Sequence, residues 1–131
     1  MTGDFKLFVK KLSECSEFIS RDGVILREII HPDKQHLSVN YSLAHAVVKP
    51  GQTSFPHYLK TTELYYIIQG NGIMTIDGES RAVEPGCTVY IPPKSVQSIQ
   101  NTSDTDLVFL CIVNPPWQQE DEIISDDIKY V

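Results

Sequence analysis

The chain has 131 residues, of which 41% are hydrophobic and 9% aromatic, and its formal net charge is −6. This length fits one domain that buries a core without disulfides, and the composition excludes a disordered or fibrous chain. The acidic balance argues against nucleic acid or an anionic membrane as a partner, and no stretch approaches the ~20 apolar residues of a membrane helix.

The cysteines and the N-terminal residues indicate the cellular compartment to expect. Cys15, Cys87 and Cys111 are far apart in the sequence and are interpreted as reduced, mostly buried thiols. The first residues lack the basic-then-apolar pattern of a secretory signal. We therefore expect a cytoplasmic protein.

The first 23 residues are expected to form an arm, and two readings of it stay open. Phe5, Leu7 and Val9 alternate as in an edge strand, whereas Ser13 to Ile19 fits one helical turn that Ser13 would cap.

From Val24 onward, short β-type runs alternate with turn chemistry. Asp77-Gly78 is a strong two-residue hairpin signal, and His31 and His36, which flank a Pro-Asp loop, are expected to be exposed. The expected strands cover residues 24–30, 41–48, 64–68, 73–76, 87–91, 95–100 and 107–113. Because no convincing helix lies between them, the pattern predicts an all-β antiparallel sandwich or barrel.

The segment from Trp117 to the end is an acidic tail with interleaved apolar residues. Its carboxylates are Glu120, Asp121, Glu122, Asp126 and Asp127, and its apolar residues are Ile123, Ile124, Ile128 and Tyr130. A solvated, partly docked tail is one interpretation, and a tail that packs on a partner subunit is the other.

Two spaced motifs carry the most specific signal. The first runs Gly51, five residues, His57, one residue, Leu59, three residues, Glu63, six residues, Gly70. The second runs Gly86, five residues, Pro92, one residue, Lys94, two residues, Gln97, three residues, Asn101. Together they resemble the two motifs of the cupin superfamily, and the resemblance extends from about Val24 to Val113. It implies an antiparallel double-stranded β-helix, or jelly-roll barrel.

The resemblance also implies a metal site, but two of its ligands are replaced. Family members use three histidines and one glutamate, which suits Zn, Mn, Ni, Fe or Cu. Here those positions read His57, Leu59, Glu63 and Gln97, so two good ligands and one weak amide oxygen remain. We therefore expect at most one weakly held divalent transition metal, at His57, Glu63 and Gln97, and a redox dioxygenase is disfavoured.

Two alternatives concern the histidines. His57 and Glu63 would form only a buried ion or hydrogen-bond pair in a site without metal. His45 would replace a lost ligand if it faced the barrel interior, which periodicity does not decide. Gln97, for its part, would either hydrogen-bond a ligand or only satisfy Glu63.

The predicted architecture is one cupin-like domain over residues 1–131, with a core of about 24–113, an N-terminal arm of 1–23 and the acidic tail of 117–131.

Three functional classes stay open. The first is a module that binds a small molecule through His57, Leu59, Glu63 and Gln97. The second is a non-redox isomerase or lyase, with His57 as general base or metal ligand and Glu63 as its partner. The third is a structural or interaction domain with a vestigial site. The resemblance further implies a homodimer, with the arm or tail at its interface.

Overall fold

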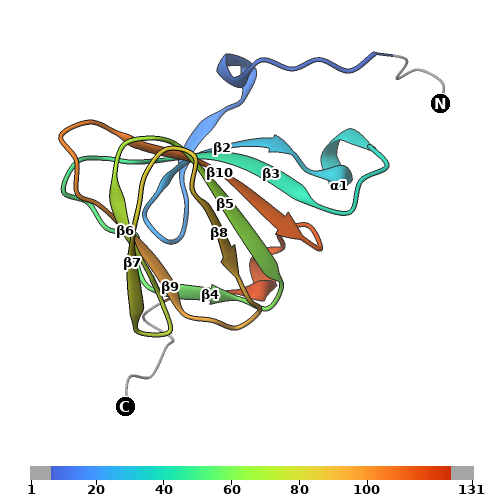
Figure 1. Ribbon diagram of the computed structural model, residues 1–131. Helices are drawn as coiled ribbons and strands as arrows, with labels where there is room; N and C mark the ends of the chain where they lie inside the picture. Colours follow the sequence, from blue (N-terminus) through green and yellow to red (C-terminus); the bar gives the residue numbers. More distant parts are fainter. Residues whose placement is uncertain (1–6, 125–131) are drawn as a thin grey trace.

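Two antiparallel sheets face each other in the computed structural model, which describes residues 7–124 (Figure 1). The larger sheet has the strand order β1-β2-β3-β10-β5-β8 and the smaller β11-β4-β9-β6-β7. The larger sheet consists of β1 (Glu17–Ile19), β2 (Ile25–Ile30), β3 (Ser42–Val48), β5 (Thr62–Gln69), β8 (Thr88–Ile91) and β10 (Leu107–Asn114). The smaller sheet consists of β4 (His57–Leu59), β6 (Gly72–Ile76), β7 (Glu79–Val83), β9 (Gln97–Asn101) and β11 (Glu122–Ile124). The predicted jelly-roll class is confirmed.

Alternating burial along the strands builds the core between the sheets. In β10 every second residue from Leu107 to Val113 is buried, because successive strand side chains point to opposite faces. Phe109 packs against Tyr65 of β5 with ring centroids 4.4 Å apart and the ring planes tilted by 36°. The other main core residues are Val24, Ala46, Val48, Ile67, Met74, Val83, Ile91, Ile99, Leu107 and Cys111.

Two motif residues, Gly70 and Asn101, have structural roles in a turn and a loop. Gly70 has φ +85°, and a Cβ there would lie 2.6 Å from the Asp106 carbonyl oxygen, so only glycine fits. Asn101 is buried, and its side-chain nitrogen donates to the Val48 and Thr105 carbonyls at 2.8 and 2.7 Å. These contacts fix the loop between β9 and β10 against β3.

The N-terminal arm differs from both readings. Residues 7–11 form no strand, a 3-10 turn covers Leu12–Glu14 instead of starting at Ser13, and Glu17–Ile19 is a strand paired with β2. The Lys11 amide donates to the Glu14 carboxylate at 2.9 Å, and Lys11 is the N-cap, two residues before Ser13. Phe5 lies outside the described residues.

His31 was predicted to be exposed, and this prediction was wrong. It is only 4% exposed, and its Nε2 lies 2.8 Å from the Trp117 carbonyl oxygen. Its Nδ1 accepts from the Asp33 amide at 3.2 Å, which caps the short helix α1 (Pro32–Gln35). His36, at the end of that helix, is exposed as expected.

The C-terminal segment is docked as far as the structure describes it. A 3-10 turn over Gln119–Asp121 leads into β11, which pairs antiparallel with β4. Asp126, Asp127, Ile128 and Tyr130 lie outside the described residues. Between residues 7 and 124, no helix has the length and apolar character needed to cross a bilayer.

Candidate functional site

A cavity of about 440 Å³ lies between the sheets, at the end where β4 and β11 face β2, β3 and β10. Its walls are mainly apolar and include Leu26, Ala46, Leu59, Tyr65, Phe109 and Trp117. The lining also includes one histidine, His57, and three acidic side chains on which the site depends: Asp22, Glu63 and Glu122. All four are more than nine-tenths buried. Apolar walls with a few convergent polar groups are typical of a small-molecule site.

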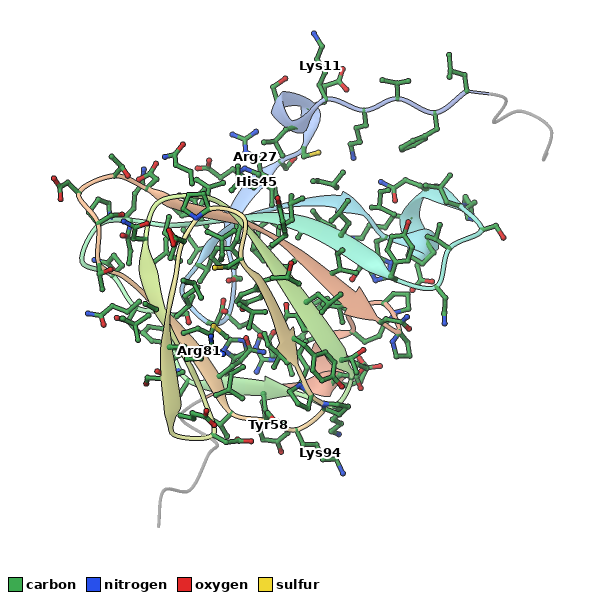
Figure 2. The ribbon with its side chains drawn as sticks, viewed as in Figure 1. Lys11, Arg27, His45, Tyr58, Arg81 and Lys94 are labelled. Carbon is green, nitrogen blue, oxygen red and sulfur yellow. The ribbon has the colours of Figure 1, made fainter. Side chains whose placement is uncertain are left out.

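The first motif places its residues as the strand period requires. His57 and Leu59, two apart on β4, are both buried and line the cavity, whereas Tyr58 between them lies on the outer side of the strand (Figure 2). Glu63 reaches the same cavity from β5 in the other sheet.

Gln97, the fourth predicted residue, joins the two sheets and is not among the cavity-lining residues. It is 1% exposed, its Nε2 donates to Glu63 Oε1 at 2.9 Å, and its Oε1 accepts from the Tyr65 hydroxyl at 2.8 Å. Both ends of the amide are therefore engaged, and the carbonyl oxygen that would bind a metal already has a partner. The interpretation that Gln97 satisfies Glu63 describes this contact.

Burial dominates the electrostatics of Glu63. Desolvation raises the pKa of this carboxyl to about 7, against the opposing effects of the His57 charge and the Gln97 hydrogen bond. The carboxyl is thus poised to hold or release a proton near neutral pH.

His57 pairs with an acid outside both motifs. Its Nδ1 lies 2.9 Å from the Phe55 carbonyl oxygen, so this nitrogen carries the proton and donates. Its Nε2 faces Asp22 Oδ2 at 3.5 Å. Asp22 sits in the turn between β1 and β2, where its carbonyl accepts from the Phe55 amide at 2.8 Å.

Glu122 completes a trio with Asp22 and His57. One ligand atom from each of the three lies within 4.8 Å of the others. Glu122 comes from β11, and its Oε1 accepts from Trp117 Nε1 at 3.3 Å. Burial raises the pKa of this carboxyl, with Asp22 acting in the same direction and the His57 charge opposing. Two carboxylates and an imidazole are a donor set that divalent cations accept.

His45 faces away from the cavity. It pairs with Arg27 across β2 and β3, and Figure 2 shows the two side by side at the N-terminal end of the barrel. Partial burial and the Arg27 charge lower the pKa of His45. Ser42, Ala44 and Ala46 of the same strand line the cavity instead, so His45 does not replace a lost ligand.

Sequence reasoning missed Asp22 and Glu122. Asp22 precedes Gly23 in a five-residue connection, which signals a turn but not what the turn faces. Glu122 is one of several acids in the tail, and only its strand pairing with β4 singles it out.

Comparisons with known proteins agree with this fold. The cupin domain family matches residues 44–113, more than half of the chain. An uncharacterized protein of Methanocaldococcus jannaschii is 38% identical over 122 residues, covering 92% of this chain and 97% of that protein. A glucose-6-phosphate isomerase of Pyrococcus horikoshii is 26% identical over 110 residues, covering 73% of this chain and 58% of the isomerase.

Solved structures show the same barrel. A predicted oxalate decarboxylase of Thermotoga maritima superposes with a TM-score of 0.72 at 23% identity, covering 82% of this chain and 99% of that one. A Cupin 2 conserved barrel domain protein of Salinispora arenicola gives a TM-score of 0.72 at 18% identity, covering 87% and 91%. The two spaced motifs, the paired sheets and the family match agree, and the chain belongs to the cupin domain family.

Proposed function

We propose that this cupin binds a small polar organic molecule in the cavity between its sheets. The observation that carries the proposal is the cavity itself: about 440 Å³, with mostly apolar walls and the buried side chains of His57, Glu63, Asp22 and Glu122 converging on it. A volume of this size suits a metabolite of ordinary dimensions.

Charge narrows the class of ligand. Asp22, Glu63 and Glu122 place carboxyl groups inside the cavity. The two long cations in its wall are engaged: Arg21 donates to the Gln119 and Glu122 carbonyls, and Lys34 lies 2.6 Å from Glu28. A neutral or cationic ligand therefore fits the metal-free cavity, whereas a phosphate or carboxylate group would face like charges.

Thermal-shift and calorimetric titrations with D-glucose, 1,4-diaminobutane, oxalate and D-glucose 6-phosphate, in chelator, test this proposal. We expect the sugar or the diamine to stabilise the fold, since a ligand that binds only the native state raises its stability. Leu59→Trp, which fills the cavity, should abolish the effect, and Tyr58→Trp on the outer side of β4 should retain it. A flat response to all four, or binding unchanged by Leu59→Trp, would favour a vestigial site.

An isomerase is the second candidate, supported by the glucose-6-phosphate isomerase relatives and by the pKa of about 7 at Glu63. In such a reaction Glu63 or His57 would take a proton from the carbon beside a carbonyl and return it to the neighbouring carbon. A coupled assay with glucose 6-phosphate and a divalent metal tests this candidate. Turnover that Glu63→Gln or His57→Gln reduces at least about a hundredfold supports it. Absence of turnover, or turnover unaffected by both changes, rejects it for this substrate.

A further inference from the structure

We propose that Asp22, His57 and Glu122 form a divalent-metal site, displaced from the positions that the two sequence motifs indicate. The site lies in the same cavity as the proposed function, but it does not depend on any organic ligand. Its three side chains come from separate segments: the β1–β2 turn, β4 and the C-terminal strand β11.

His57 is oriented as metal-ligating histidines are. Its Nδ1 donates to the Phe55 carbonyl at 2.9 Å, which fixes the ring and leaves Nε2 as the free nitrogen facing Asp22. The 3.5 Å between Nε2 and Asp22 Oδ2 exceeds a normal hydrogen bond. Two tetrahedral ligands at ~2.1 Å from zinc are about 3.4 Å apart, so this separation suits an intervening ion.

Each carboxylate has one oxygen held from outside the trio. Asp22 Oδ1 accepts from the Ser20 hydroxyl, and Oδ2 faces His57. Glu122 Oε1 accepts a hydrogen bond from Trp117 Nε1 at 3.3 Å. This bond does not use the second carboxylate oxygen, Oε2, which is left for a metal ion. Outer partners of this kind orient ligating groups in metal sites.

Glu122 lies beside Leu59, the motif position that lacks a metal ligand. Glu122 is the register partner of Leu59 in the β4–β11 pair, and both residues are buried and line the cavity. Directly opposed residues have Cβ atoms about 5 Å apart. The carboxylate on β11 therefore stands beside the position where β4 carries an aliphatic side chain.

The motif set is a poorer metal site. Leu59 has no lone pair, Gln97 Oε1 accepts from Tyr65, and Glu63 Oε1 accepts from Gln97. The trio instead holds two buried carboxylates against one imidazole, an excess of negative charge that a divalent cation balances. One nitrogen and two carboxylate oxygens suit Mn²⁺ or Zn²⁺, and three protein ligands leave coordination positions open.

Calorimetric titration of the chelator-stripped full chain with MnCl₂ and with ZnCl₂ tests the site. Asp22→Asn and Glu122→Gln remove charge but keep the acceptor oxygens that Ser20 and Trp117 use. Glu63→Gln is the matched control, because it changes a buried cavity carboxyl outside the trio. Circular dichroism establishes that each variant is folded, and the Mn²⁺ resonance signal provides a second reading of binding.

We expect one ion per wild-type chain, with affinity reduced at least about tenfold by Asp22→Asn and by Glu122→Gln, and reduced less by Glu63→Gln, which removes a neighbouring charge but no ligand. Paramagnetic broadening of the His57 ring protons should accompany Mn²⁺ binding and be lost in both trio variants. Absence of binding by the folded wild type overturns the proposal. So does affinity that depends on Glu63 and not on Asp22 or Glu122. Metal binding without any response to the organic panel would reject the proposed function and leave this site standing.

Discussion

Replacing Glu63 by glutamine should remove the part of the pH dependence of the free energy of unfolding that comes from titration of the Glu63 carboxyl. In the native chain, burial raises the pKa of this carboxyl from 4.5 to about 7. Between these values the folded state keeps a proton that the unfolded state releases. The free energy of unfolding therefore falls as pH rises through this window, and the loss is nearly complete above pH 7.

The magnitude follows from the two pKa values. Integrating the difference in bound protons between pH 5 and pH 8 gives a loss of about 2–3 kcal/mol, at about 1.4 kcal/mol for each full proton and pH unit. The amide introduced by Glu63→Gln cannot titrate, and its oxygen can still accept from Gln97. The difference in stability between Glu63→Gln and the wild type should therefore move in favour of the variant by about 2–3 kcal/mol from pH 5 to pH 8.

Urea denaturation at pH 5, 6, 7 and 8, in chelator, measures this difference, because groups common to both proteins cancel. Glu120→Gln is the control, since Glu120 is exposed, and it should follow the wild-type pH dependence within about 0.5 kcal/mol. A constant difference between Glu63→Gln and the wild type across the four pH values would show that Glu63 is ionised throughout, and the reasoning from burial would be refuted.

Four further predictions follow from the same contacts. Mn²⁺ at a hundred times its Kd should raise the wild-type free energy of unfolding by about 2.7 kcal/mol, and an equal gain in Asp22→Asn at the same concentration would contradict the trio. Leu59→His added to Glu122→Gln should restore at least part of the lost metal affinity, as judged by calorimetry; no recovery in a folded double variant counts against the compensation. Tyr65→Phe removes the hydroxyl that donates to Gln97 and should cost about 1–3 kcal/mol in urea denaturation, and an unchanged midpoint would mean that Gln97 has another donor. The homodimer implied by the family resemblance stays a prediction, which light scattering on the full chain checks, and a monomer mass would reject it.

The barrel was predictable because its signals are local. Alternating apolar residues predict the strands, Asp77-Gly78 predicts a hairpin, and the motif spacings place His57, Leu59 and Glu63 toward one interior. The contact of Gln97 with Glu63 was also among the interpretations. These inferences need only the strand period and the order of the turns.

The pairing of His57 with Asp22 was not predictable, because it depends on contacts between distant parts of the chain. The turn that carries Asp22 accepts a hydrogen bond from the Phe55 amide, and a Cβ at Gly23, which has φ +86°, would lie 3.3 Å from the Phe55 ring. His31 was misread for a similar reason: its partner, the Trp117 carbonyl, arrives from the C-terminal segment. The local sequence pattern around Asp22 or His31 does not indicate a partner that comes from a distant part of the chain.

The proposed trio implies that a metal site can lie at a different place within the same barrel. Leu59 on β4 offers no donor, and in the proposed site Glu122 supplies one from the strand paired beside it, where it is the register partner of Leu59. Because this group is a carboxylate and not an imidazole, the proposed site is richer in oxygen and carries more negative charge than a site of three histidines and one glutamate. That charge has to be neutralised by protons or by a cation, because buried carboxylates lack water to stabilise them. Protonation of Glu63 and metal binding at the neighbouring trio are therefore two outcomes of one electrostatic requirement, and a cation in the cavity should lower the pH at which Glu63 ionises.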